Sequence, residues 1–284
     1  QVPKSDNNTT FNGSVSIDTL WNLFQADRES SFVTQQYRFL GTKVQNITDK
    51  ESFRALIQCP KHTHDTVTRA IQFMAILLQT KEQMRIGLDD IFKNAKQDNV
   101  NYFELFLRPS LHTKRGLSLA EVVNTIMEQR DELVKRYEID CNIILYSDNG
   151  EDGIEQLRQT AFLVVEHKKK IAGFAHFGLN ADRQDFSPQE IAVFNLLKKH
   201  QINVSMTSAF ADPRSLLVAL SDAGATRLSG CYAIHQERQL MDYLARNRVP
   251  VEFGITETSK KYLRESQQLT PKNKREIVQL YMEM

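Results

Sequence analysis

Short apolar runs alternate with amphipathic stretches along most of this sequence. The apolar runs carry few charges and lie at residues 102–107, 141–146, 171–177, 202–206, 226–232 and 249–254. Stretches with helical periodicity separate them, at residues 118–137, 153–167, 188–199, 213–223 and 236–247. Strands that are apolar along their whole length are typical of parallel sheets that helices cover. The alternation therefore predicts a parallel α/β fold.

The part of the chain before residue 99 follows a different pattern. Residues 15–98 are helical in periodicity almost throughout, so we expect a long helical excursion between a first and a second strand. Farther on, Ser187-Pro188 and Asp212-Pro213 each pair a capping residue with a proline, which marks the start of a helix. No repeat or Gly/Ser linker divides the sequence, and we expect one domain over residues 1–284.

Composition narrows the class of protein. The chain has 284 residues, of which 41% are hydrophobic and 25% are charged, and these values are normal for a soluble globular protein. The formal net charge of +1 gives no strong positive field, so we expect no nucleic-acid partner. No apolar run reaches the length of about 18 residues that a transmembrane helix needs, and we expect no membrane association.

Cysteines and glycosylation sequons bear on the cellular compartment. Three cysteines are too few and odd in number for a disulfide framework, so we expect ordinary reduced or buried thiols at Cys59, Cys141 and Cys231. The N-terminus has no signal-peptide pattern, which favours an intracellular location in the cytoplasm or nucleus. Secretion is the alternative, because sequons begin at Asn7, Asn8, Asn12, Asn46 and Asn203. Asn203 falls in an expected buried strand, so we interpret its sequon as chance.

The N-terminal segment PKSDNNTTFNGS resembles the adenosine deaminase family of the amidohydrolase superfamily, whose first strand reads roughly P-K-x-E-L-H-x-H-L-x-G-S. The frame is kept at Pro3, Lys4, Asp6, Gly13 and Ser14. Asn8 and Thr10 stand where the family has two zinc-binding histidines. The resemblance implies a degenerate first strand near residues 6–11.

Later segments continue the resemblance in the same order. NVNYFELFLRP is similar to the second strand, where Glu104 and Pro109 match and Phe106 replaces an arginine. IAGFAHFGLN is similar to the fourth strand, in which Gly173 and Gly178 are kept while Ala175 and Asn180 replace acids. RLSGCY and VEFGITETS resemble two further strand ends, with matches at Arg227, Glu252 and Thr256.

The resemblance implies a single (β/α)8 TIM-type barrel. The eighth-strand motif T-D-D is absent, so the barrel is expected to be incomplete at its eighth strand, or a segment is missing near residues 268–270.

Deaminase chemistry in the family uses a zinc ion that activates water, together with a glutamate that protonates the purine. Thr207 stands in the place of the third histidine ligand, Phe210 in the place of the glutamate, and Gly230 in the place of another histidine. Amide, hydroxyl and phenyl groups do not replace imidazole and carboxylate as zinc ligands. The resemblance therefore predicts a pseudoenzyme with no zinc, no other cofactor and no deaminase activity.

We expect this pseudoenzyme to act as a binding, regulatory or scaffolding subunit with a protein partner, and an oligomer is compatible with that role. Gly178 and Glu252 are the positions at which purine binding would be retained. The alternative is a divergent hydrolase whose active site is relocated or metal-free, built from Glu104, His176, Cys231, His235 and Glu252. A third reading is a secreted, growth-factor-like relative.

All the histidines but His235 have simpler interpretations. His62 and His64 form an H-x-H within CPKHTHD, but this segment lies among helices, and we read it as a polar loop before an amphipathic helix rather than a metal site. His176 lies within an expected strand, where a hydrogen-bonded core histidine is the more common outcome. His112, His167 and His200 read as loop or helix-end residues.

Overall fold

The computed structural model describes residues 2–58, 64–148, 153–177, 185–207, 213–231, 234 and 237–252. Within these ranges seven strands form one sheet, and their order in the sheet follows their order in the chain. The strand pairs β1–β2, β2–β3, β4–β5, β5–β6 and β6–β7 are all parallel. The predicted parallel α/β fold is therefore confirmed. The strands are β1 Lys4–Thr10, β2 Val100–Leu107, β3 Asp140–Asp148, β4 Ile171–Phe177, β5 Asn203–Thr207, β6 Arg227–Ser229 and β7 Val251–Glu252.

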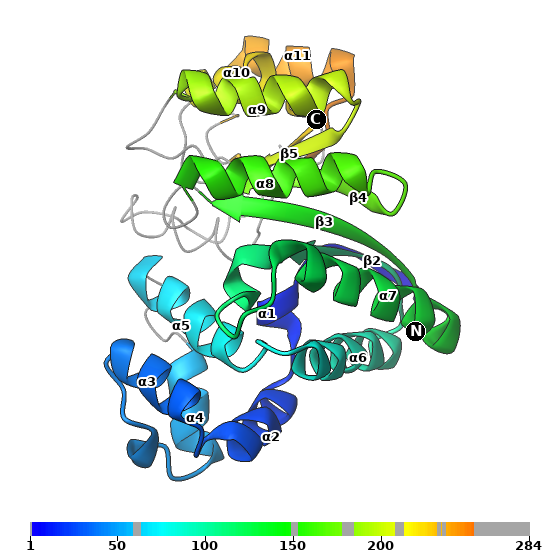
Figure 1. Ribbon diagram of the computed structural model, residues 1–284. Helices are drawn as coiled ribbons and strands as arrows, with labels where there is room; N and C mark the ends of the chain where they lie inside the picture. The colour runs from blue at the N-terminus through cyan, green and yellow to red at the C-terminus, as the bar shows by residue number, and fades with distance from the viewer. Residues whose placement is uncertain are drawn as a thin grey trace, which may run out of the picture. The chain divides into compact units, whose positions relative to one another are not determined.

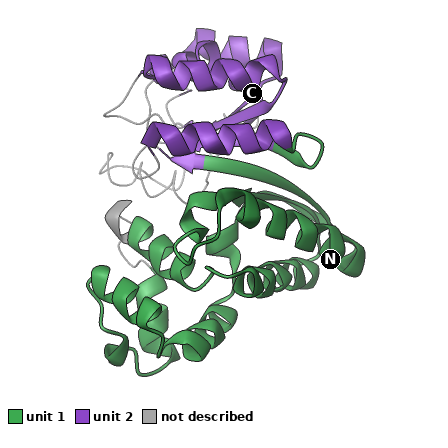
Figure 2. Ribbon diagram, in the orientation of Figure 1, with its two compact units in different colours: residues 1–146, 167–172 green, residues 147–166, 173–284 purple. Residues whose placement is uncertain are grey.

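Contacts divide the chain into two compact units, which Figure 2 colours separately. Unit 1 consists of residues 1–146 and 167–172, and unit 2 of residues 147–166 and 173–284. The division falls inside β3 and inside β4, not at the end of the helical excursion.

Unit 1 holds the helical excursion between β1 and β2 (Figure 1). Most of its longer helices begin at a capping side chain: Ser16 accepts from the Thr19 N–H, and Thr80 and Gln83 form a reciprocal capping box. Ser118 and Glu121 form another capping box, at the start of the helix that follows β2. The helices are α1 Phe11–Ser14, α2 Ile17–Asp27, α3 Ser31–Phe39, α4 Lys50–Ile57, α5 His64–Ile76, α6 Lys81–Gln97 and α7 Leu119–Tyr137, with 3-10 helices η1 Val44–Asn46 and η2 Pro109–His112.

The excursion has an aromatic core of its own. Phe24 of α2 lies 5.3 Å from Phe53 of α4 and 5.5 Å from Tyr37 of α3, measured between ring centroids. Tyr37 in turn lies 5.0 Å from Phe73 of α5. All four rings are buried. Aromatic rings at these distances stabilise a core beyond the area they bury, so the helices between β1 and β2 are held together by their own packing.

Unit 2 places helices after its strands, namely α8 Gly153–Glu166, α9 Pro188–Lys199, α10 Pro213–Ser221 and α11 Arg238–Asn247 (Figure 1). The predicted cap at Ser187 is confirmed, since Ser187 forms a capping box with Glu190 and Pro188 is the first residue of α9. On β5, Val204 and Met206 are buried on one face, while Thr207 on the other face is half-buried. One face of this part of the sheet is therefore apolar and the other is polar.

Several predicted boundaries shift in the structure. β4 and α9 have the predicted bounds. β6 is shorter than residues 226–232, because Gly230 adopts a left-handed conformation with a φ of 72° directly after it. β1 lies at Lys4–Thr10 rather than residues 6–11, because Phe11 begins a helical turn. Residues 268–270, near which the sequence predicts a missing eighth strand or segment, lie outside the described residues.

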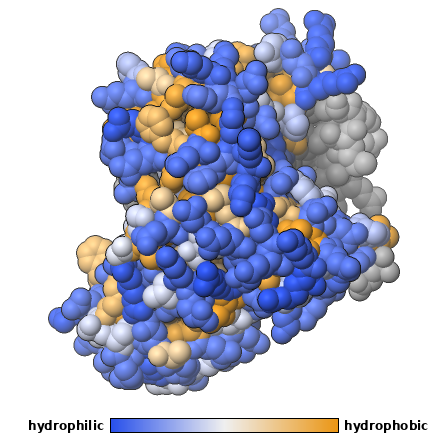
Figure 3. Space-filling model, turned by 45° about the vertical axis from the view of Figure 1, so that its right-hand side comes forward, coloured by the Kyte–Doolittle hydropathy of each residue, from blue (hydrophilic) through white to orange (hydrophobic). Residues whose placement is uncertain are grey.

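The surface offers few large apolar side chains. Blue, hydrophilic residues prevail on the face drawn in Figure 3, with orange residues between them. Phe39 at the end of α3 is the most exposed large apolar side chain of the described residues, at 85%. None of the helices in the described ranges combines the length and the apolar character that crossing a bilayer requires.

The sequons differ in accessibility. Asn7, Asn8 and Asn46 are exposed, whereas Asn12 is buried in α1. Asn203 is the first residue of β5, a largely buried strand as predicted, but its own side chain is exposed. Its neighbours Ile202 and Val204 are buried, because successive side chains of an extended chain point to opposite faces.

Candidate functional site

The end of β1 in unit 1 carries two of the predicted site positions. Asn8 is exposed, and its backbone N–H donates to Asp6 Oδ1. The pairing of β1 with β2 shifts register between Asp6 and Thr9, so an extra residue lies there. Residues two apart on a regular strand share a face, and a bulge interrupts this alternation. Asn8 and Thr10 therefore do not share a face in the way that residues two apart on a regular strand do.

Thr10 is half-buried and pairs with Phe106 of β2. Its hydroxyl faces the next turn, because a β-carbon on Gly13 would lie only 2.7 Å from Thr10 Oγ1. A side chain at position 13 would therefore force the Thr10 hydroxyl to move. The Thr10 hydroxyl thus occupies space that a side chain at position 13 would otherwise fill.

A buried histidine that the sequence predicts in a loop or at a helix end lies next to this turn. His112 of η2 is fully buried, with Nδ1 2.7 Å from Leu78 O and Nε2 3.2 Å from Asn12 Oδ1. Burial lowers the pKa of His112 to about 4, so the imidazole is neutral. Its ring also meets the edge of Phe11 at 5.2 Å.

The tautomer of His112 follows from its partners. A neutral ring that donates from Nδ1–H to Leu78 O can only accept at Nε2. We therefore assign the Asn12 amide with its nitrogen toward His112, since amide orientation is fixed by the hydrogen-bond network. This orientation also gives a partner to the Asn12 Nδ2 group, which otherwise has none among the described residues.

The polar face of the unit 2 sheet carries a half-buried ion pair between Arg227 and Glu252. Arg227 Nη1 lies 3.3 Å from Glu252 Oε1, and Arg227 Nε donates to Ser205 Oγ at 3.2 Å. Arg227 thus joins β5, β6 and β7. Glu252, a predicted ligand-binding residue, carries its carboxylate in this ion pair, and its contact with a ligand stays a prediction.

Gly230 and Thr207 lie at the ends of neighbouring strands. Thr207 is half-buried and pairs with Ser229, and Ser229 pairs with Glu252. The backbone N–H of Gly230 donates to the backbone oxygen of Glu252 at 3.1 Å. The structure therefore brings Thr207, Gly230 and Glu252 to one end of the unit 2 strands. Cys231 follows directly and is fully buried; burial, and then the Glu252 carboxylate, raise the pKa of its thiol to about 12.

His176 lies on the opposite, apolar face of the same strands. Its ring is 1% exposed and meets Phe194 of α9 at 5.6 Å. His176 Nδ1 lies 3.0 Å from Ser147 Oγ, while Nε2 lies 3.8 Å from Glu190 Oε1 and has no hydrogen-bond partner among the described residues. The expected core histidine is therefore satisfied at only one of its two nitrogens.

Several other predicted positions fall outside the described residues. They are Gly178, Phe210, His62, His235 and the side chain of His64. Cys141 and Cys231 are free and buried, as the sequence predicted for ordinary thiols, while Cys59 lies outside the described ranges.

The sequence as a whole identifies the protein family to which this chain belongs. A family profile described as adenosine deaminase matches residues 3–271. The chain belongs to the adenosine deaminase family. Among its relatives, a probable adenosine deaminase from Dictyostelium discoideum is 32% identical over 269 residues, which are 92% of this chain and 35% of the relative. An adenosine deaminase from Streptococcus mutans is 26% identical over 66% of this chain and 53% of its own length. The chain thus spans between a third and about half of these relatives.

Solved structures share the fold of this adenosine deaminase family member. An adenine deaminase from Arthrobacter aurescens matches with a TM-score of 0.75 at 12% identity, covering 94% of this chain and 76% of that protein. An amidohydrolase from Burkholderia ambifaria, solved with bound Zn, matches with a TM-score of 0.73 at 17% identity, covering 97% of this chain and 70% of that one. At these identities the likeness establishes an amidohydrolase-type, TIM-like fold and nothing further.

Zinc does not fit the side chains at the positions that the sequence resemblance assigns to the family's zinc ligands. Asn8 offers an amide, Thr10 and Thr207 offer hydroxyls, and Gly230 offers no side chain. Zinc sites in proteins are built from imidazole, thiolate and carboxylate ligands. Across the described part of the chain, no cluster of three or more His, Cys, Asp or Glu side chains has the geometry to hold a metal ion.

Proposed function

We propose that this adenosine deaminase family member has lost deaminase chemistry at its own strand ends and works as a binding, regulatory or scaffolding domain. The observation that carries the proposal is the donor set at positions 8, 10, 207 and 230, which holds no imidazole, thiolate or carboxylate. Without such ligands a metal is not held, and water is not activated at neutral pH.

The backbone supports the same proposal. A bulge lies between Asp6 and Thr9, where a metal-binding H-x-H strand would need regular alternation. Gly230 has a φ of 72°, a conformation that costs free energy for a residue with a β-carbon. Main-chain geometry as well as side-chain identity thus disfavours histidine ligands at these places.

The alternative of a metal-free hydrolase receives less support. His176 lies on the helix-covered face of unit 2, on the face opposite that of Ala175, so it does not join the polar strand face. The Cys231 thiol stays protonated near neutral pH because its pKa is about 12, and a protonated thiol is a poor nucleophile.

An activity assay on untagged protein tests the loss of chemistry. The chain is incubated with adenosine, with and without added zinc, and inosine is measured by liquid chromatography; an active adenosine deaminase is assayed in parallel as the positive control. We expect no inosine above the blank without protein in either condition. Zinc-dependent formation of inosine that is proportional to the chain concentration would overturn the proposal.

A second experiment distinguishes a purine-binding regulatory domain from a scaffold that binds a protein partner. Calorimetric titration with adenosine and with inosine measures purine binding, for which Gly178 and Glu252 are the proposed contacts. Saturable binding that weakens in Glu252→Gln, but not in the exposed control Glu166→Gln, would support a purine-binding regulatory domain. No binding by a folded chain would favour a scaffold that binds a protein partner.

A further inference from the structure

One helix of unit 1 turns aromatic side chains away from the core. α3 buries Val33 and Tyr37, while Phe39 at its end is 85% exposed. Phe39 lies two residues after Tyr37, which is about 200° around a helix, so its ring points away from the aromatic core of the excursion. Phe32 lies on the same side of α3 as Phe39, where the Arg115 guanidinium covers its ring at 4.4 Å. We call this side the outer face of α3; Figure 1 shows α3 at the edge of the helical excursion, away from the strands.

The end of α3 fixes the position of Phe39. Gly41 follows the helix with a φ of 76°. The Gly41 N–H donates to Arg38 O at 2.9 Å. The Thr42 N–H donates to Tyr37 O, also at 2.9 Å. These two hydrogen bonds form a Schellman motif, which is a defined helix end, so the exposed ring belongs to a closed turn and not to a frayed one.

The segment that carries this helix is positively charged. Residues 31–48 contain Arg38 and Lys43 and no aspartate or glutamate. Both cations are exposed, and neither forms an ion pair with a described residue. The nearest carboxylates along the chain each have a partner of their own, which leaves the two cations without a counter-charge from them. They are Asp27, Glu29 and Asp49.

Two more cations reach the same helix from other elements. Arg69 of α5 donates from Nε to Leu40 O at 3.0 Å. Lys114 Nζ donates to Gln36 Oε1 at 3.4 Å. Both acceptors are neutral groups, and in the described part of the chain neither cation has an ion-pair partner, so these charges are not cancelled. The outer face of α3 therefore combines a protruding aromatic ring with four cations.

We propose that the outer face of α3 docks on an anionic membrane surface, with the Phe39 ring entering the headgroup region. Aromatic side chains with lysine and arginine beside them are typical of protein segments that lie on the membrane interface. Anionic lipids attract cations that come near the surface. A protruding ring needs a matching pocket on a protein, whereas a fluid lipid interface accepts it without one. The lipid surface is therefore favoured over an acidic protein partner.

The proposed contact is peripheral. The sequence expectation of no membrane association rested on the lack of an apolar run long enough to span a bilayer, and an interfacial contact needs no such run. The contact is also separate from the strand-end positions discussed above, because α3 belongs to the helical excursion of unit 1. It does not rest on the loss of deaminase chemistry.

Vesicle binding tests the proposal. The chain is sedimented with vesicles of phosphatidylcholine alone, or of phosphatidylcholine with about one third phosphatidylserine. We expect saturable binding to the anionic vesicles that weakens as salt is raised, because salt screens the attraction between exposed charges. Binding to the neutral vesicles is expected to be about tenfold weaker or less. Equal binding to both kinds of vesicle, or no binding to the anionic ones by folded protein, would overturn the proposal.

A matched pair of aromatic variants locates the contact. Phe39→Ser is expected to lower the affinity for anionic vesicles about fivefold, because the ring no longer leaves water. Phe162→Ser, which removes a 50% exposed ring of α8 in unit 2, is expected to bind as the wild type does. Both rings lie at the surface, so both variants are expected to fold. Binding that Phe39→Ser leaves unchanged would show that the outer face of α3 is not the contact.

A matched pair of charge variants tests the role of the cations. Arg38→Gln combined with Lys43→Gln is expected to lower the affinity for anionic vesicles about tenfold. Lys168→Gln combined with Lys169→Gln makes the same change in net charge at exposed positions after α8, and is expected to have little effect. Equal losses in the two double variants would mean that net charge alone drives binding, and would contradict docking through α3.

Discussion

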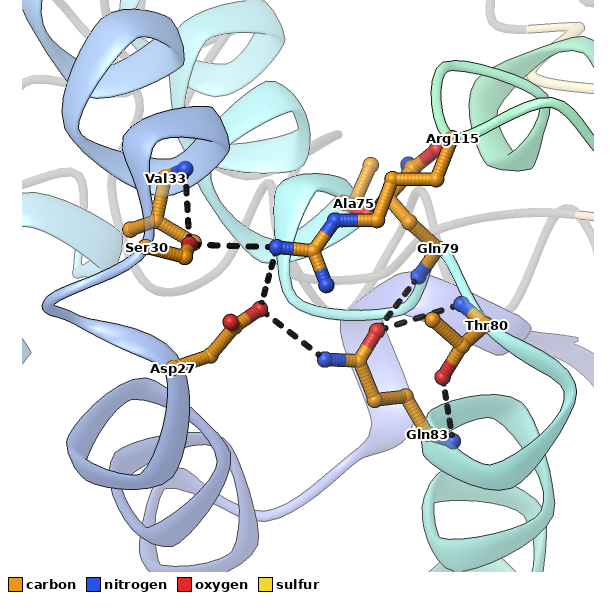
Figure 4. A network of polar contacts seen from close by, with 8 residues as sticks. All are labelled: Asp27, Ser30, Val33, Ala75, Gln79, Thr80, Gln83 and Arg115. Atoms are coloured by element: carbon orange, nitrogen blue, oxygen red, sulfur yellow. Dashed lines mark hydrogen bonds and ion pairs between the residues drawn. The ribbon is translucent and has the colours of Figure 1, made fainter.

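Arg115 and Asp27 form an ion pair in which Arg115 Nη2 lies 2.7 Å from Asp27 Oδ2. The same Nη2 donates to Ser30 Oγ at 3.1 Å, and Gln83 Nε2 donates to Asp27 Oδ2 at 3.2 Å (Figure 4). Arg115 precedes α7, Asp27 ends α2 and Gln83 lies in α6. Within unit 1 this network fastens the helical excursion to the segment that follows β2.

Removal of Arg115 is expected to destabilise unit 1. Arg115→Ala loses the ion pair, the bond to Ser30 and a contact 4.4 Å above the Phe32 ring, and its side chain is only 23% exposed. We expect a loss of about 2 kcal/mol in the free energy of unfolding, measured by urea denaturation. The control is Arg136→Ala, whose side chain is 58% exposed, with an expected loss of about 0.5 kcal/mol. Equal losses in the two variants would contradict this account.

His112 gives unit 1 a pH-dependent stability. Burial lowers its pKa from an ordinary 6.5 to about 4, so between these values the unfolded chain binds a proton that the folded chain does not. The contribution is fully present above pH 6.5 and is lost as the pH falls toward 4, by about 3 kcal/mol in total. We expect His112→Gln to flatten the stability profile between pH 6.5 and 5, and His167→Gln to keep it. An unchanged slope in His112→Gln would refute this assignment.

Gly230 provides a test of backbone geometry at the end of β6. Its φ of 72° is tolerated by glycine, less well by asparagine and poorly by other residues. In thermal or urea unfolding we expect a graded loss of stability, small in Gly230→Asn and about 1–2 kcal/mol in Gly230→His. Zinc affinity should not appear in Gly230→His. A Gly230→His variant as stable as wild type would show that this backbone accepts histidine.

The two described cysteines are expected to be unreactive in the folded chain. Burial raises the pKa of both the Cys141 and the Cys231 thiol to about 12, so the thiolate fraction at pH 8 is about a thousandfold below that of an ordinary thiol. In a Cys59→Ser background, labelling with a disulfide reagent should proceed only as fast as the chain unfolds. Urea-unfolded chain is the control and should be labelled at once. Rapid labelling of native protein would be inconsistent with this burial.

Local signals in the sequence were enough to predict much of the fold. The apolar run 171–177 and the Ser187-Pro188 cap predict β4 and α9 with the bounds that the structure shows. The end of β6 was not predictable, because its cause is the left-handed φ of Gly230, and the run 226–232 carries no other break. The bulge in β1 was equally hidden, since Asn8 was interpreted only as a polar substitution for a zinc ligand.

The polar contacts of the two buried histidines were harder to predict from the sequence than the helices and strands. The partners of His112 are Leu78 and Asn12, which lie 34 and 100 residues away in the chain, and no local pattern links them. The orientation of His176 was readable in principle, because it shares strand parity with Phe174, which is fully buried. Its proximity to Glu190 depends instead on how α9 packs on β4, which sequence periodicity does not specify.

We propose that the strand ends of this adenosine deaminase family member no longer form a zinc site. The most direct test is the zinc content of untagged protein by elemental mass spectrometry, after dialysis against micromolar zinc and then against metal-free buffer. We expect far less than one zinc atom per chain. One tightly held zinc per chain, lost on substitution of Asn8, Thr10 or Thr207 by alanine, would contradict it.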